Sequence, residues 1–105
     1  MILIQNFFNT IQNSTNKELI DEINGSFLIV IDDVNYYFID FTKKTIVLTN
    51  ENNKNYDCLI NISKNDFISF ISKEISFDEL FTQGKIACEG NFAMLFKFKL
   101  LVNFE

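Results

Sequence analysis

The side chains of this 105-residue chain that could carry chemistry are two cysteines, three tyrosines and fourteen carboxylates, with no histidine or arginine. Histidine is the commonest general base and metal ligand, and arginine captures phosphate through two parallel hydrogen bonds. Neither Cys58 nor Cys88 has a histidine to activate its thiol. Asp32, Asp33 and Asp40 cluster near an expected turn, as surface carboxylates do. These residues argue against catalysis, so we expect a protein that is not an enzyme and that uses no metal and no cofactor.

The two cysteines lie 30 residues apart, each inside a strand pattern. Free cysteine behaves as a small buried hydrophobe, and disulfides are rare in the cytosol. The first residues lack the basic region and cleavage site of a signal peptide, and no apolar run approaches the ~20 residues that span a bilayer. The sequence therefore favours two buried reduced thiols over a disulfide or redox pair, in a cytoplasmic protein.

The charged residues limit the partners. Nine lysines oppose fourteen acids, and a net charge of −5 argues against nucleic-acid binding, which needs a basic face. Lys85, Lys97 and Lys99 could meet an acyl carboxylate or CoA phosphates, although solvated surface charges are the favoured interpretation. Gln83 could donate to a ligand head group or satisfy the backbone at a helix end, and the second role is favoured.

Phenylalanine is the outlier of the composition, with thirteen copies. Each ring can bury ~150–250 Å², which is more aromatic contact area than a core of this size usually contains. The length allows one domain over residues 1–105. The core of that domain is therefore unusually aromatic, or some of the rings line a cavity that a ligand fills.

The elements that must position these residues follow from the spacing of apolar residues. Helical spacing covers residues 2–13 and continues to residue 23 after a cap at Thr15 or Asn16. Capping boxes at Ser63 and Ser76 begin two further short helices. The five expected strands are 27–31, 36–41, 45–49, 58–63 and 85–89. Because short links join the first four strands, the sequence favours a meander, with Asp33 or Asn35 as the left-handed residue of its first turn.

Two of the three glycines bracket the last strand. Gly84 is expected to close a helix, and Gly90 with Asn91 to start another, because glycine reaches positive φ without steric cost. Residues 92–102 that follow hold only two polar positions. Residues 96–100 also alternate like a strand, but the cap at Asn91 favours a helix with apolar contacts on more than one side.

Four segments together resemble the sterol carrier protein type 2 domain. They are Asp57-Cys58-Leu59-Ile60-Asn61-Ile62-Ser63, Asp66-Phe67, Phe81-Thr82-Gln83-Gly84-Lys85-Ile86 and Gly90-Asn91. The resemblance covers about residues 25–102, and the N-terminal helical segment fits it loosely. It implies an α+β fold in which a five-stranded, mostly antiparallel sheet carries about five helices on one face, with an apolar tunnel between them.

The same resemblance implies non-enzymatic binding or transfer of a fatty acyl, acyl-CoA, phospholipid or sterol-like ligand. The tunnel walls would come from the helices before and after the strand at 85–89. The ten candidate ligand-binding residues are Phe67, Phe70, Ile71, Phe77, Leu80, Phe81, Gln83, Met94, Leu95 and Phe98. Individual rings of the last helix, such as Phe92, Phe96 and Phe98, are equally compatible with core or cavity.

Two functions from different classes remain open. One is a lipid carrier, a monomer or weak dimer that binds a small apolar ligand and touches membranes transiently. The alternative is an accessory protein-interaction module for an enzyme of a lipid or isoprenoid-quinone pathway, docked through its apolar last helix.

Overall fold

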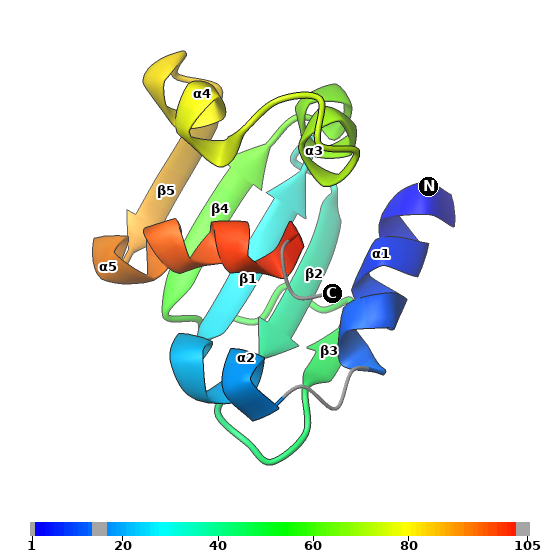
Figure 1. Cartoon of the computed structure of the whole chain (residues 1–105), viewed down its shortest axis with the longest axis vertical. Coiled ribbons are helices and arrows are strands. Elements are labelled where there is room, and N and C mark those ends of the chain that lie inside the picture. The colour runs from blue at the N-terminus through cyan, green and yellow to red at the C-terminus, as the bar shows by residue number, and fades with distance from the viewer. Residues whose placement is uncertain (1, 14–16, 103–105) are drawn as a thin grey trace.

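The computed structural model describes residues 2–13 and 17–102, except the side chain of Ile2. One sheet is formed by β1 (Ser26–Ile31), β2 (Asn35–Asp40), β3 (Val47–Thr49), β4 (Cys58–Ile62) and β5 (Ile86–Gly90). The helices are α1 (Ile2–Gln12), α2 (Lys17–Ile23), α3 (Lys64–Ile71), α4 (Phe77–Thr82), α5 (Phe92–Leu95) and the 3₁₀ segment η1 (Phe96–Val102). All of these helices lie over the same face of the sheet, and α5 with η1 runs across the middle of it (Figure 1). The expected α+β architecture is confirmed. Among the described residues, every helix is too short or too polar to cross a membrane.

The order of strands corrects the expected meander. β4 does not pair with β3 but crosses to β1, so that the sheet reads β3-β2-β1-β4-β5, with β1 and β4 parallel. The six residues of β1 are all buried, and its central place gives this most apolar strand hydrogen-bonded neighbours on both sides. Tyr56, at the end of the link from β3 to β4, packs against a small cluster on the second face of the sheet. This contact and the burial of β1 favour the crossover over simple antiparallel addition at the edge of β3.

The turn between β1 and β2 has left-handed residues at Asp32 (φ 54°) and Asp33 (φ 61°). Asp33 was one of the two expected positions, whereas Asn35 already belongs to β2. The Asp32 carboxylate accepts a hydrogen bond from the backbone N–H of Lys64 at 2.9 Å, and that of Asp33 accepts one from the Asn61 amide at 2.8 Å. These carboxylates therefore join the turn to β4 and to the start of α3, a structural role.

The helix ends follow the local signals with one exception. Ser76 forms a complete capping box with Glu79. Ser63 accepts from the backbone N–H of Asp66, but the return bond is replaced by an ion pair of Asp66 with Lys85 at 3.9 Å. Aspartate is one methylene shorter than the glutamate that a capping box requires, which explains the difference. The cap expected at residues 15–16 lies outside the described residues.

The last segment is helical, as the sequence favours, but only its first turn is α-helical. The 3₁₀ form has three residues per turn and places residues i and i+3 on one line. Leu95, Phe98 and Leu101 therefore share one fully buried face, whereas Phe92 and Phe96 are exposed. This geometry decides which rings of the segment belong to the core.

Candidate functional site

Most of the residues expected to line a ligand site meet between the sheet and the helices. Ile71 is partly buried and packs against this cluster, whereas Phe81 and Gln83 lie at the surface. The buried members are Phe67, Phe70, Phe77, Leu80, Met94, Leu95 and Phe98. The candidate residues come from α3, α4, α5 and η1, and most of them lie close together in the folded chain.

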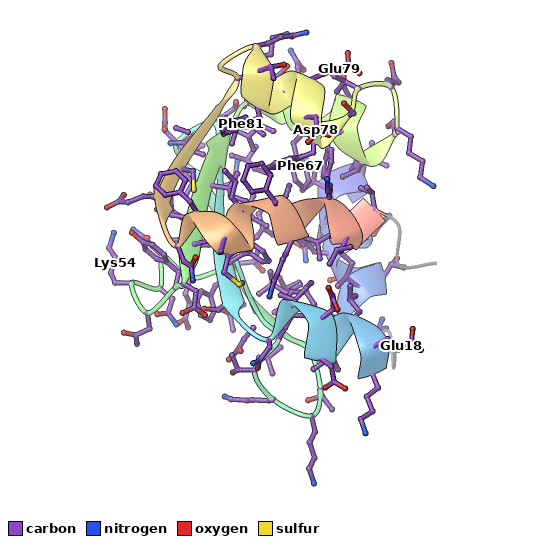
Figure 2. All side chains as sticks on the ribbon, turned by 60° about the vertical axis from the view of Figure 1, so that its left-hand side comes forward. Glu18, Lys54, Phe67, Asp78, Glu79 and Phe81 are labelled. Atoms are coloured by element: carbon purple, nitrogen blue, oxygen red, sulfur yellow. The ribbon has the colours of Figure 1, made fainter. Side chains whose placement is uncertain are left out.

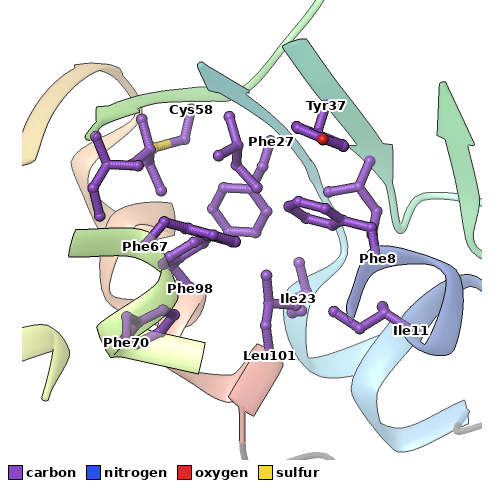
Figure 3. Close-up of a cluster of buried hydrophobic side chains, with 14 of the residues drawn as sticks. Phe8, Ile11, Ile23, Phe27, Tyr37, Cys58, Phe67, Phe70, Phe98 and Leu101 are labelled. Carbon is purple, nitrogen blue, oxygen red and sulfur yellow. The ribbon is translucent and has the colours of Figure 1, made fainter. Parts of the chain in front are cut away.

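Phe98 is the centre of this cluster. Its ring stacks on Phe70, with centroids 5.2 Å apart and planes 15° apart. It also contacts Phe77 at 5.7 Å and Phe67 at 6.3 Å, and on the sheet side Phe27 of β1 at 5.7 Å. Figure 3 shows Phe67, Phe70 and Phe98 grouped against Phe27. The rings fill the space between one another, so a ligand that entered this cluster would have to displace them.

Residues of the first helix and of the sheet also join this cluster, and they were not among the ten candidates named from the sequence. Phe8 of α1 stacks on Tyr37 of β2 at 4.5 Å and on Phe67 at 5.6 Å. Its place in the helical stripe of residues 2–13 was the available signal, but the resemblance drew attention to the later helices. Burial also raises the pKa of Tyr37 above its ordinary value.

A line of aromatic contacts leads from the core to the surface. Phe77, 2% exposed, contacts Phe96 at 6.3 Å, and Phe96 contacts Phe81 at 5.7 Å. Phe96 and Phe81 are 46% and 43% exposed, and Figure 2 places Phe81 on the side of α4 toward α5. We call Phe81 and Phe96 the exposed phenylalanine pair. The pair lies between α4 and η1 and extends the ring contacts from the buried core to the protein surface.

Two hollows open on either side of η1, and both are bordered by Lys73 and Val102. The first, of about 240 Å³, lies between α1, the end of α3 and η1. The second, of about 390 Å³, lies beside the link from α3 to α4 and has Phe70 and Phe77 in its wall. Ligand pockets commonly measure ~300–1,000 Å³. The second hollow therefore has the volume of a small ligand site and reaches two rings of the central cluster.

The lysines considered as head-group anchors have partners within the chain. Lys85 pairs with Asp66 at 3.9 Å, Lys99 with Asp78 at 4.0 Å, and the Lys97 ammonium donates to the carbonyl of Ile23 at 3.4 Å. Because each ammonium already has a partner within the chain, these contacts favour a structural role for the three lysines over ligand binding.

Gln83 is the C-cap of α4, and its backbone N–H donates to the Glu79 carbonyl at 3.0 Å while its residue is exposed. This position agrees with a helix-end role. Within the described residues, no three acidic, histidine or cysteine side chains gather as metal ligands.

Asp57 fixes the position of α5 over the sheet. Its carboxylate accepts from the backbone N–H of Ser26 at 2.9 Å, which ties β4 to the start of β1. Its carbonyl accepts from the N–H of Asn91 at 2.8 Å, and the Asn91 side chain caps α5 by accepting from Ala93 at 2.9 Å. Gly90, at φ 101°, passes directly over this carbonyl. The polar contacts at this end of the sheet thus set where α5 and η1 begin to cross the core.

This arrangement, a mixed five-stranded sheet with an aromatic core under helices on one face, can be compared with known proteins. The sequence model of the SCP-2 sterol transfer family matches residues 4–103. The chain belongs to this family. The resemblance noted on residues 57–91 is thereby confirmed, and the family match also includes α1 and α2, which the sequence motifs had covered only loosely.

Relatives of the SCP-2 domain agree with this assignment. The chain is 26% identical over 94 residues to the Caenorhabditis elegans protein named non-specific lipid-transfer protein-like 1, covering 86% of this chain and 80% of that protein. Sterol carrier protein 2 from Yarrowia lipolytica in its apo form superimposes with a TM-score of 0.74 at 16% identity, over 91% of this chain and 86% of that one. A sterol carrier protein domain of Helicoverpa armigera gives 0.75 at 20% identity, over 94% and 84%. At these identities, the two structures show a shared fold.

Proposed function

We propose that this SCP-2 family domain binds and transfers lipid without catalysis, holding a fatty acyl, acyl-CoA, phospholipid or sterol-like ligand between the sheet and the helices. The observation that carries the proposal is the cluster of rings around Phe98, which continues to the surface through Phe96 and Phe81. Family membership and the naming of the nematode relative support it. We place the protein in the cytoplasm, as a monomer or weak dimer.

The energetics of such a site follow from its apolar walls. Each methylene that leaves water for an apolar surface contributes ~0.8 kcal/mol, so a long acyl chain can offset the displacement of several rings. Phe70 and Phe77 border both the core cluster and the 390 Å³ hollow. A chain entering from the hollow would first part these rings from Phe98, which they contact at 5.2 and 5.7 Å.

Purified protein is expected to carry co-purified lipid and to take up a fluorescent fatty acid. Native mass spectrometry followed by organic extraction measures the first property, and fluorescence titration the second. A ligand-free monomer that takes up no fatty acid would contradict the proposal.

The location of the site is tested by Leu95→Trp, because Leu95 is fully buried in the face of the last segment that meets the core. The larger side chain would occupy apolar space that the ligand needs, and overpacking of this kind costs ~1–3 kcal/mol. The dissociation constant of the fatty acid should therefore rise about tenfold. The matched control is Phe92→Trp, in the same helix but 59% exposed, which should change affinity less than about twofold. Circular dichroism establishes that both variants are folded. Equal affinities for folded Leu95→Trp and wild type would show that the ligand lies elsewhere.

Contact with membranes is proposed to use the exposed phenylalanine pair. Removing both rings, in Phe81→Gln with Phe96→Gln, should slow transfer of a fluorescent lipid to vesicles about thirtyfold, because the two rings together lose ~2 kcal/mol of burial in the bilayer. Affinity for soluble fatty acid should fall much less than the transfer rate, because Phe81 and Phe96 are exposed and the buried rings around Phe98 are unchanged. Val34→Gln is the control, since Val34 is an apolar residue 69% exposed in the β1–β2 turn, on other elements than α4 and η1. Unchanged transfer by the double variant would reject this surface.

The exposed rings also favour the second candidate, an accessory module for an enzyme of a lipid or isoprenoid-quinone pathway. Phe81, Phe92 and Phe96 are large apolar side chains on neighbouring helices, and each is at least 43% exposed. Such a module should purify without ligand and self-associate through this face. Size-exclusion chromatography of wild type beside the Phe81→Gln, Phe96→Gln variant separates this outcome from a lipid-loaded monomer.

A further inference from the structure

The two cysteines lie side by side on the face of the sheet that meets the helices. Their Sγ atoms are 3.5 Å apart, and both thiols are free. Cys58 of β4 lies opposite Gly90, and Cys88 of β5 lies opposite Ile60, so the two are diagonal neighbours on adjacent strands. Cys58 is fully buried, whereas Cys88 is partly buried against the same core. The sequence-level expectation of two reduced thiols agrees with this state, but their contact was not expected from a separation of 30 residues.

We propose that Cys58 and Cys88 form a reversible disulfide that fixes the edge strand β5 to β4. A disulfide joins sulfur atoms at ~2.05 Å, so the thiols need to approach by about 1.5 Å, within reach of side-chain rotation and a small strand shift. Diagonal neighbours in a sheet have Cα atoms ~7–8 Å apart, beyond the ~5.5–6 Å that a disulfide prefers. The bond would therefore carry some strain and be easily reduced, which suits a reversible link.

The oxidation can be written with hydrogen peroxide as the oxidant. Cys88 is the more accessible thiol, and burial raises the pKa of Cys58, so the Cys88 thiolate reacts first. Its sulfur attacks one peroxide oxygen, the O–O bond breaks, and a sulfenic acid and one water form after protonation. The Cys58 sulfur then attacks the Cys88 sulfur, its proton leaves with the hydroxyl as a second water, and the S–S bond forms. The two thiols together lose two electrons, and peroxide gains them.

The disulfide would hold β5, the strand that connects α4 to α5 in the proposed lipid site. β5 has only β4 beside it within the described sheet, and it follows α4 and precedes α5 directly (Figure 1). Movement of β5 away from β4 would therefore separate α4 from α5 and open the core near Phe81 and Phe96. Fixing β5 to β4 is expected to slow lipid exchange. This effect rests on the proposed function, whereas the formation of the disulfide is independent of it.

The bond itself is tested by mass spectrometry on the full chain. After peroxide treatment, the monomer should lose the mass of two hydrogen atoms, resist iodoacetamide at both cysteines when unfolded in urea, and regain both reactive thiols when dithiothreitol is added to the unfolded chain. The oxidised protein should also melt ~5–10 °C higher, because the link closes the loop that contains α3 and α4. Cys88→Ser and Cys58→Ala are the controls, and neither should show the mass loss or the shift. Full alkylation of oxidised wild type, or only disulfide-linked dimers, would overturn the proposal.

The consequence for lipid is measured by exchange of bound fluorescent fatty acid from oxidised and reduced protein. A severalfold slower release after oxidation, absent in Cys88→Ser, supports the link between β5 and the lipid site. Equal release rates from a protein that binds fatty acid would overturn that consequence while the mass measurement still decides the bond. Failure to bind fatty acid in either state would reject the proposed function instead.

Discussion

Phe98→Ala is expected to lower the free energy of unfolding by about 3–5 kcal/mol, among the largest effects that one substitution can have in this chain. The ring is fully buried and contacts Phe27, Phe67, Phe70 and Phe77. Its removal takes away the transfer free energy of the side chain and leaves a cavity that β1, α3 and α4 cannot close without moving. Urea denaturation followed by circular dichroism measures the loss.

Phe92→Ala provides the matched control for Phe98→Ala, because the same side chain is removed from the same terminal helical segment at a site that is 59% exposed. Its cost should stay within about 0.5 kcal/mol. If both variants lost equal stability, the face formed by Leu95, Phe98 and Leu101 would not be the buried one. If Phe98→Ala lost less than about 1 kcal/mol, the ring cluster would not be the packed core.

Gly90→Ala is expected to destabilise the domain by about 2 kcal/mol or more, since two costs add at this position. Gly90 has φ 101°, which side-chain-bearing residues rarely adopt, and an added Cβ would lie 2.5 Å from the carbonyl oxygen of Asp57. That oxygen accepts the Asn91 N–H, so a shift of the backbone would also disturb the start of α5. Thermal unfolding should show a clear fall in the melting temperature and a loss of fatty-acid affinity.

Gly84→Ala separates the two costs. Gly84 also has positive φ, 68°, but an added Cβ there meets no atom within 4 Å. Only the backbone term remains, about 1 kcal/mol. A Gly84→Ala variant that lost as much stability as Gly90→Ala would show that the contact between the added Cβ and the Asp57 carbonyl oxygen does not contribute to the loss.

Local signals in the sequence were enough to place most elements. The serines before α3 and α4, the glycine after α4, the glycine that ends β5 and the asparagine before α5 all lie at the ends of elements in the structure. The alternation in β4 correctly put Cys58, Ile60 and Ile62 on the buried face. These features were predictable because a cap or a pleat depends on a few neighbouring residues and on backbone sterics.

Pairing and packing were not predictable from the same signals. The parallel pairing of β4 with β1 corrected the expected meander, because a choice among strand partners depends on burial summed over the whole sheet. The resemblance pointed to helices whose buried side chains do lie together, yet the outward placement of Phe81 and Phe96 depends on how α4 meets the 3₁₀ segment.

The sequence by itself determined an aromatic, acidic α+β domain of the SCP-2 sterol transfer family, with its helix ends, strand faces and lack of histidine and arginine. The tertiary structure alone decided which rings contact one another, which reach the surface, and that Cys58 lies 3.5 Å from Cys88. The physical reason is distance along the chain. A turn or cap is stabilised by atoms a few residues apart, whereas contacts between distant segments form only when the entire core packs in one arrangement.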